Sequence, residues 1–143
     1  MISKRFVFSW LASSIAMFLL SYVWHGVFLT DFSRLSYPKE LFLIFAAIVY
    51  LIIGFIIAKA IDIAFLYKHF RRKPIIRGAI SGGCCGILLF LISTVVGVSF
   101  STGSTIENLL LDVSWQITEQ LAGGIVTGIV HIFVFDPTAI YED

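Results

Sequence analysis

Residues 41–58 read LFLIFAAIVYLIIGFIIA, a run of eighteen residues without a charge. A helix of about 20 mostly apolar residues crosses the hydrocarbon core of a bilayer. Lipid supplies no hydrogen-bond partners, so a segment that crosses it must be helical or belong to a closed barrel. The run does not alternate between apolar and polar residues, as the strands of a membrane barrel do. We therefore expect a transmembrane helix here.

Three further segments are similarly apolar, which predicts an all-α bundle of four antiparallel transmembrane helices over about residues 6–29, 39–70, 75–101 and 105–136. Pro38 and Pro74 lie where the first turn of a helix tolerates proline. Residues 104–107 (STIE) have the pattern of a capping box and predict the start of the fourth helix. The second helix is expected to continue past Ile61 as an amphipathic segment. Pro137 should end the fourth helix, because proline lacks the donor needed to continue it.

The composition supports a membrane location. Of the 143 residues, 59% are hydrophobic and 13% are charged, against about 25% charged residues in a typical soluble domain. A single small globule cannot bury so many apolar side chains, so the lipid bilayer is the predicted partner. The net charge of +1 argues against binding to nucleic acid. Cys84 and Cys85 are adjacent and match no metal-binding spacing, so no cofactor or metal is predicted.

Lysine and arginine are unevenly distributed among the predicted connections. Lys4 and Arg5 precede the first helix, and only Arg34 and Lys39 lie between the first and second. Five basic residues lie between the second and third helices: Lys68, Arg71, Arg72, Lys73 and Arg77. The positive-inside rule then places both termini and this basic connection in the cytoplasm, in a multi-pass protein of the plasma membrane. No small-residue cleavage pattern follows the first apolar run, so we expect it to be a retained helix.

Glycine recurs at intervals of four in the third and fourth predicted helices. Gly78, Gly82 and Gly86 form one series, and Gly124 and Gly128 form another. Small residues at this spacing allow helix backbones to approach closely in lipid. Packing within the chain is the favoured interpretation, and a homodimer face is the alternative. Because the connections are short, the helices should form an up-down-up-down bundle in which the first and fourth meet.

Polar side chains inside the first and fourth predicted helices form two faces. The fourth helix has residues at spacings of three and four: Asp112, Trp115, Gln116, Glu119 and Gly123. The first helix has Ser14, Ser21 and His25 on one face, with Trp24 beside it. Ionisable residues within a membrane span face the bundle interior and mark functional sites by default. A polar pocket is therefore predicted between these two helices.

The depths of these residues match. Counted from the outer ends of the helices at about 1.5 Å per residue, His25 is level with Asp112. The same count places Ser21 level with Gln116 and Glu119, and Glu119 close to the middle of the membrane. Asp112 is expected to accept a hydrogen bond from His25 and to favour its charged form.

Of the predicted pocket residues, Glu119 has the largest free-energy cost of burial in the membrane. No predicted span offers it a basic partner at its depth, so its carboxyl should hold a proton for much of the time. A histidine near the outer face that leads to a mid-membrane acid resembles half of a proton path. At about 100° per residue, His131 lies about 120° from the Glu119 face, so the path is incomplete within one chain. The alternative is that these polar groups only fix the register of the helices.

Several other polar and aromatic residues receive ordinary interpretations. Trp10 and Tyr50 are expected to pack or to lie at the interface. Lys59 and Asp62 are three residues apart, where they can pair or extend toward the membrane surface. The basic run of residues 68–73 should determine topology, with binding of anionic lipid head groups as a secondary role.

Two short motifs carry a resemblance to a known group of proteins. Residues 24–26 (WHG), followed by Asp31 and Phe32, lie near the end of the first helix, and residues 111–115 (LDVSW) open the fourth. Together with the glycine-rich start of the third helix, this pattern resembles an uncharacterised family of small four-helix bacterial membrane proteins. The resemblance spans most of the chain and implies the same fold and topology. It implies no activity, because that family is a domain of unknown function.

Three functional hypotheses follow. The pocket binds or conducts a small solute or a proton, in a protein that can be a homo-oligomer. Alternatively, the chain is an accessory or assembly subunit that packs against a larger membrane complex through its glycines. Enzymatic activity is disfavoured, because no set of nucleophile, base and acid and no phosphate-binding loop is recognisable.

Overall fold

The computed structural model describes residues 3–29, 37–98 and 105–134. These residues form helices and no strand. The first helix, α1 (Lys4–Ser21), continues directly as a π-helix, η1 (Tyr22–Phe28). It is followed by α2 (Lys39–Ala60), the short α3 (Ala64–His69), α4 (Pro74–Val98) and α5 (Ile106–Phe133).

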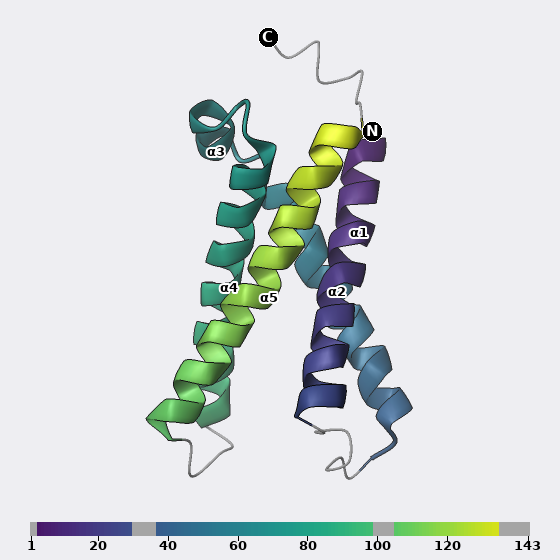
Figure 1. Cartoon of the computed structure of the whole chain (residues 1–143), viewed down its shortest axis with the longest axis vertical. Coiled ribbons are helices and arrows are strands. Elements are labelled where there is room, and N and C mark those ends of the chain that lie inside the picture. Colours follow the sequence, from purple (N-terminus) through teal and green to yellow (C-terminus); the bar gives the residue numbers. More distant parts are fainter. Residues whose placement is uncertain (1–2, 30–36, 99–104, 135–143) are drawn as a thin grey trace.

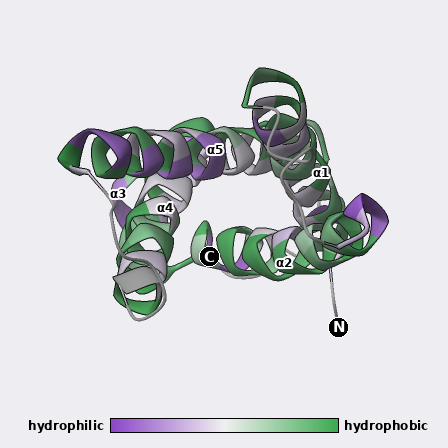
Figure 2. Cartoon of the chain, turned by 90° about the horizontal axis from the view of Figure 1, so that it is seen from below, coloured by the Kyte–Doolittle hydropathy of each residue, from purple (hydrophilic) through white to green (hydrophobic). Residues whose placement is uncertain are grey.

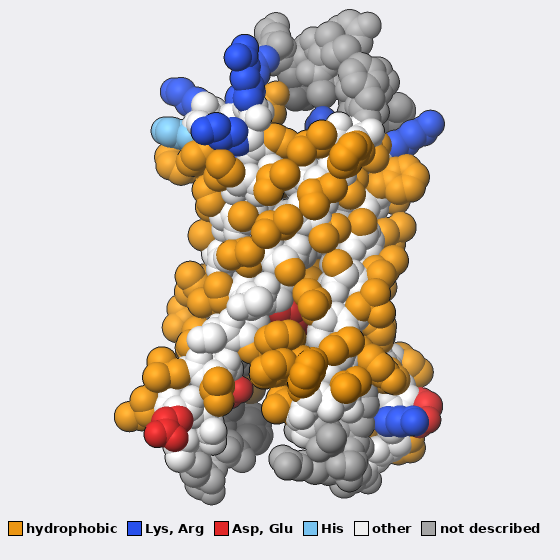
Figure 3. All heavy atoms as spheres, viewed as in Figure 1, with side chains coloured by type: hydrophobic (Ala, Val, Ile, Leu, Met, Phe, Trp, Pro, Cys, Tyr) orange, Lys and Arg blue, Asp and Glu red, His pale blue; other side chains and the backbone are white. Residues whose placement is uncertain are grey.

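The four long helices run alternately up and down, as Figure 1 shows. The start of α1, the end of α5 and the helix α3 lie at one end of the molecule. Lysine and arginine side chains gather at this end in Figure 3, and we call it the basic end. Seen along the bundle in Figure 2, the helices form a ring in which α5 packs against both α4 and α1, and α1 packs against α2.

Large apolar side chains are exposed on all four long helices, and Figure 3 shows them over the face that it presents. Phe8 of α1, Ile52 of α2, Leu88 of α4 and Leu110 of α5 are each more than half exposed. In water the exposure of such an apolar surface is unfavourable. In a bilayer the hydrocarbon chains of the lipids solvate it without a cost in free energy.

Three of the described helices are long and apolar enough to cross a membrane: Lys4–Phe28, Lys39–Ala60 and Pro74–Val96. The chain is therefore an all-helical protein with the character of a multi-pass membrane protein. The sequence analysis expected a fourth span in α5. That helix is long enough to cross a membrane, but it is less apolar than the other three. Its polar side chains include Glu107, Asp112 and Glu119, together with amides and a histidine.

The two glycine series lie together in one seam between α4 and α5. A Cβ atom on Gly78 would fall on the backbone carbonyl of Gly124, and one on Gly82 would fall on the carbonyl of Gln120. Gly86 faces the backbone of Ile117 in the same way, and Gly128 approaches Pro74 and Ile75. The seam therefore holds two helices of one chain together by close backbone contact, without room for side chains.

The second predicted helix differs from the structure at its end. We expected one helix over residues 39–70, but α2 ends at Ala60 and a turn over residues 61–63 separates it from α3. Ile61 is fully buried in this turn, and the next residue, Asp62, reaches across to α4 and α5. Burial of Ile61 and pairing of Asp62 thus take the place of a continuous helix.

The predicted helix ends are partly outside the described residues. Thr105 is the N-cap of α5, because its hydroxyl accepts a hydrogen bond from the Asn108 amide at 3.3 Å. The predicted stop at Pro137 and the last residues of the third predicted helix lie outside the described part of the chain.

Candidate functional site

The buried face of α5 is polar. Glu119 is 2% exposed, and Gln120 and Thr127 are completely buried. Each of these side chains faces other helices rather than lipid, because α5 is enclosed by α4 on one side and by α1 on the other. The polar residues that weaken the apolar character of α5 are therefore largely the ones that the bundle encloses.

Glu119 belongs to a chain of three side chains from three helices. The Tyr50 hydroxyl of α2 lies within hydrogen-bonding reach of the Glu119 carboxyl of α5. Ser21, the last residue of α1, is within reach of the same Tyr50 hydroxyl. The second carboxyl oxygen, Oε1 of Glu119, is buried without a hydrogen-bond partner. No described lysine, arginine or histidine forms an ion pair with Glu119. We call Ser21, Tyr50 and Glu119 the carboxyl site.

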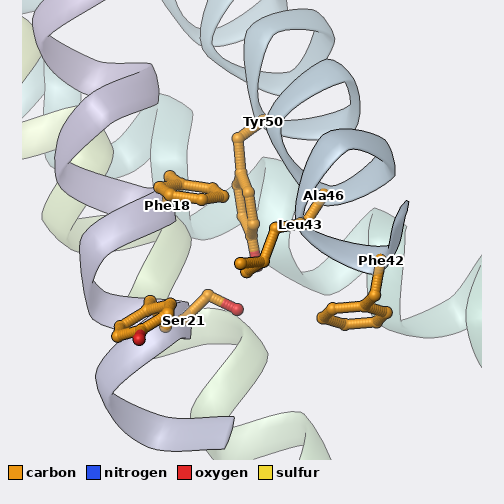
Figure 4. Close-up of a pocket in the computed structure, with 7 residues that line it drawn as sticks. Phe18, Ser21, Phe42, Leu43, Ala46 and Tyr50 are labelled. Atoms are coloured by element: carbon orange, nitrogen blue, oxygen red, sulfur yellow. The ribbon is translucent and has the colours of Figure 1, made fainter. Parts of the chain in front are cut away.

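A small cavity adjoins the carboxyl site. Figure 4 shows Tyr50 and Ser21 at its wall, with an edge of Phe18 against the tyrosine ring. It is lined by Phe18, Ser21, Tyr22, Phe42, Leu43, Ala46 and Tyr50. The volume of this cavity is about 10 Å³, which is room for about one water molecule. The site can therefore contact a single water on its Ser21 side, but this cavity does not hold a larger solute.

Two stacked tryptophans lie one helical turn beyond Glu119, away from the basic end. The rings of Trp24 and Trp115 are 4.2 Å apart between centroids and tilted by 10°. Trp24 belongs to the π-helix η1, where the wider turn changes the direction of side chains relative to an α-helix. Single-turn π-segments inside α-helices are frequent at functional sites. The stack joins η1 to α5.

The structure brings some of the predicted pocket residues together and separates others. Ser21 and Glu119 meet through Tyr50, and Trp24 meets Trp115. His25 is partly buried in η1, whereas Asp112 is exposed, and no hydrogen bond or ion pair joins the two. Gln116 is partly buried, and its backbone carbonyl faces Gly86 of α4.

The register of α1 against α5 explains this difference. The Ser9 hydroxyl lies 3.1 Å from Nδ1 of His131, and two turns further along each helix Met17 lies against Gly123. Continued in the same register, Ser21 faces Glu119 and residue 25 faces residue 115. Asp112 is then about 4.5 Å further along the helix than the position opposite His25.

Tyr50 is the site residue that the sequence analysis missed. It was expected to pack or to lie at an interface, because a tyrosine in an apolar helix has no sequence partner. A repeat of four residues was a second missed signal: on α1 it places Ser9 against His131 of α5 and Met17 against Gly123 of α5, and Ser13 and Ser21 fall on the same stripe. Ser14, which was placed in the pocket, instead donates to the Trp10 carbonyl at 2.8 Å and lies against Gly54 of α2.

A second polar group lies at the basic end. Asp62 Oδ2 is 3.6 Å from Nε2 of His131, and its Oδ1 is 3.7 Å from Nη1 of Arg77. The Arg77 guanidinium also lies over the ring of Tyr67, at 4.8 Å from the centroid. We call Ser9, Asp62, Arg77 and His131 the ionic cluster. The expected partner of Asp62, Lys59, instead lies over the ring of Phe6 at 4.7 Å.

The surroundings of Asp62 set its pKa. Burial alone would raise the pKa of this carboxyl. The hydrogen bond and charge of His131 act against burial, and Arg5 and Arg77 add positive charge. Together they hold the pKa of Asp62 below its usual value. The carboxylate is therefore the stable form in the folded protein.

Both ring nitrogens of His131 face acceptors. Nδ1 lies 2.9 Å from the carbonyl oxygen of Thr127, which can only accept, so Nδ1 carries a hydrogen. Nε2 lies 3.6 Å from the Asp62 carboxylate. The His131 side chain is 2% exposed, so the protein encloses both contacts.

The fold and the two polar groups define the class of molecule. It is an all-helical membrane protein with three strongly apolar helices and an interior carboxyl on a fourth helix. Among the described residues, no three His, Cys, Asp or Glu side chains are grouped so that they could hold a metal ion. No protein-family model matches the chain, and neither the curated proteins nor the solved structures gave a significant match. The resemblance stated from the motifs stays a prediction.

Proposed function

We propose that this chain is a four-span membrane protein that takes up and releases a proton at Glu119. In this proposal α5 is the fourth span, with its acid turned toward the other helices and its apolar side chains toward lipid. Both termini and the basic end lie in the cytoplasm, as the distribution of lysine and arginine favours.

The observation that carries the proposal is the isolation of the Glu119 carboxyl. It is 2% exposed, and its described partner is a neutral hydroxyl rather than a base. An unpaired carboxylate is costly in such surroundings, so the neutral acid is favoured at rest. A purely structural role would be served by an apolar or amide side chain at lower cost.

The carboxyl site also accommodates the charged form for a short time. The Tyr50 hydroxyl donates to the carboxyl, and Ser21 supports that hydroxyl in turn. A hydrogen bond from a neutral donor stabilises a carboxylate by roughly 1.5–3 kcal/mol. The site can thus exist with and without the proton, which is the property that a proton carrier requires.

The size of the nearby space favours a proton over a larger solute. The cavity beside Tyr50 holds about one water, whereas pockets for small organic molecules measure about 300–1,000 Å³. A wider groove of about 240 Å³ lies on the outside of the bundle. Its lining by Trp10, Ile48, Leu51, Ile52 and Phe55 is apolar, which suits a lipid chain rather than a polar substrate.

The alternative of an accessory subunit depended on the glycine series as a surface for a partner. Gly78, Gly82, Gly86, Gly124 and Gly128 are all occupied by contacts between α4 and α5. No observation in the described residues favours this alternative further, and the proton hypothesis is the one that we develop.

Proton flux into vesicles tests the proposal. The purified protein is reconstituted into liposomes with a trapped pH-sensitive dye, and a potassium diffusion potential drives protons inward. We expect acidification faster than in protein-free vesicles, loss of the excess rate in Glu119→Gln, and a reduced rate in Tyr50→Phe. Glu107→Gln is the matched control, because Glu107 is exposed at the start of the same helix. Equal rates for the wild type and Glu119→Gln would overturn the proposal.

A further inference from the structure

A second row of polar side chains leads from the middle of the bundle to the basic end. Ser13 and Thr127 are completely buried, as is Ser9 one turn further along α1. Ser9 contacts His131, which contacts Asp62. The Asp62 side chain is 45% exposed, so the row ends where protons can exchange with water. We call Ser13, Thr127, Ser9, His131 and Asp62 the inner row.

The hydroxyl groups of Ser13 and Thr127 both lie at Gly123. The Thr127 hydroxyl donates to the carbonyl of Gly123 at 3.1 Å, and Ser13 faces the same glycine. The Ser13 oxygen is buried without a hydrogen-bond partner in the protein. Buried hydroxyls need partners, and an internal water is the partner that a polar site of this kind accommodates.

Met17 separates the inner row from the carboxyl site. It lies between Ser13 and Ser21 on the same stripe of α1 and is 0% exposed. Its thioether packs where a Cβ atom of residue 123 would be, so the absence of a side chain at Gly123 makes room for it. On its other side it packs with Ile53, Ile57 and Cys85. The thioether of Met17 and the side chains of Ile53 and Ile57 offer no exchangeable proton, and the thiol of Cys85 is the one such group in this cluster.

We infer that Met17, seated against Gly123, is the barrier between the carboxyl site and the inner row, and that the inner row is the route by which the Glu119 proton reaches the basic end. This inference rests on the proposed function of Glu119. The carboxyl site then opens toward the cavity beside Ser21, and the inner row opens at Asp62. Methionine suits a movable barrier, because its three rotatable bonds let it change shape without strain.

The proton balance along this route is simple. The Glu119 acid loses a proton and becomes a carboxylate, to which Tyr50 donates. When Met17 moves aside, the proton passes over water and the hydroxyls of Ser13 and Ser9. The His131 ring turns its bare nitrogen toward Ser9, accepts the proton there, and passes the proton on its other nitrogen to Asp62, which releases it to water. Glu119 stays a carboxylate until it takes up a proton from the Ser21 side, so one proton crosses in each cycle.

The charged groups around His131 determine how readily it exchanges a proton. Asp62 from the turn after α2 lies 3.6 Å from its Nε2. Arg77 of α4 pairs with the other oxygen of Asp62, and Arg5 of α1 adds a second positive charge to the same group. Tyr67 of α3 lies beneath Arg77. A carboxylate facing several positive charges can accept a proton only briefly, which suits release to the surface.

Truncation of Met17 tests the inference in the same vesicles. We expect Met17→Ala to raise the proton flux by about tenfold, which corresponds to about 1.4 kcal/mol of barrier. Leu19→Ala is the matched control, because Leu19 lies two residues away on the same helix and is 55% exposed. Met17→Leu keeps the volume of the barrier and should conduct like the wild type. Met17→Val removes less volume than alanine and should raise the flux by less.

The inner row is tested by a second substitution. We expect His131→Gln to remove most of the flux that Met17→Ala adds, since the row is then broken beyond Ser9. Folding of each variant is checked by its thermal unfolding in detergent, and Met17→Val supplies the result if Met17→Ala does not fold.

The outcomes separate this inference from the proposed function. If the wild type and Glu119→Gln conduct differently but Met17→Ala equals Leu19→Ala, the carboxyl site stands and the barrier is rejected. A raised flux in Met17→Ala that His131→Gln does not reduce rejects the inner row. If the wild type and Glu119→Gln conduct equally, the proposed function fails irrespective of the Met17 variants.

Discussion

Two polar groups on α5 differ in how their charges are balanced. At the ionic cluster, Asp62 faces His131 and Arg77, and every charge has a partner of opposite sign. At the carboxyl site, about 18 Å along the same helix at 1.5 Å per residue, Glu119 faces the hydroxyl of Tyr50 and no described cation. Each group contains a serine and an acid, but only the ionic cluster also contains basic side chains that neutralise its acid.

The difference indicates different roles. Paired charges tie the turn after α2 to α4 and α5, and removal of Asp62 leaves the buried Arg77 guanidinium without its carboxylate. An acid without a counter-ion adds little to the stability of the fold, because it must stay protonated or pay for its charge. The ionic cluster should therefore respond mainly through stability, and the carboxyl site mainly through proton transfer.

The largest effect is expected for Asp62→Ala. It leaves the Arg77 guanidinium, whose side chain is 5% exposed, without its carboxylate. We expect a loss of roughly 2 kcal/mol in the free energy of unfolding, less than for a fully buried pair because Asp62 is partly exposed. Thermal unfolding in detergent measures it, with Glu119→Gln as the comparison. An equal or larger loss in Glu119→Gln would remove the distinction between the two groups.

Acid should act on the ionic cluster in a defined direction. The pKa of Asp62 is lower in the folded chain than its usual value of about 3.9. The unfolded chain therefore binds this proton first, so the stabilisation is complete above the usual pKa and is lost as the pH falls through the lower folded value. Unfolding midpoints measured from pH 6 downward should fall in this range. In Asp62→Asn the midpoint should change less with pH; identical profiles would contradict the assignment.

Tyr50→Phe should have a smaller effect on stability and a specific effect on the acid. The lost hydrogen bond corresponds to about 1 kcal/mol. The infrared carbonyl band of the protonated Glu119 carboxyl, identified by its disappearance in Glu119→Gln, should shift when the tyrosine donor is removed. Tyr67→Phe, at the other end of the bundle, should leave that band in place. A band that does not move in Tyr50→Phe would show that Tyr50 does not contact the acid.

The smallest effect is expected for Trp24→Phe. The stacked pair of Trp24 and Trp115 should lose about 0.5–1 kcal/mol of favourable contact. The fluorescence of the remaining Trp115 should change on removal of its neighbour. Substitution of Trp10, which donates to the carbonyl of Leu51 on the other side of α1, should leave the Trp115 environment unchanged.

The course of the helices was largely predictable, because long apolar runs and glycine spacing are local properties of the chain. The break after Ala60 was not, since residues 59–70 continue a pattern that suits a helix. The break depends on the contact between Asp62 and His131, which are 69 residues apart in sequence. The four expected spans became three strongly apolar helices and a more polar α5, whose place in the bundle follows from its glycine contacts with α4.

The candidate site was predictable in part. Glu119 was recognised as an unpaired acid in an apolar context, and Ser21 and the two tryptophans were placed near it. The partner Tyr50 and the separation of His25 from Asp112 depended on the register between helices. A helical face can be read from spacing, but spacing does not say how far one helix slides along another.

From the sequence alone, this chain is a helical membrane protein with an acid in the interior, because hydrophobicity and spacing act within each helix. The tertiary structure decided the partner of that acid, the pairing of Asp62 with His131 and the place of Met17 between two polar regions. These depend on how deeply side chains fit into the facing helix, and above all on Gly123, which admits Met17. Packing between helices, rather than pattern within them, selects which polar groups meet.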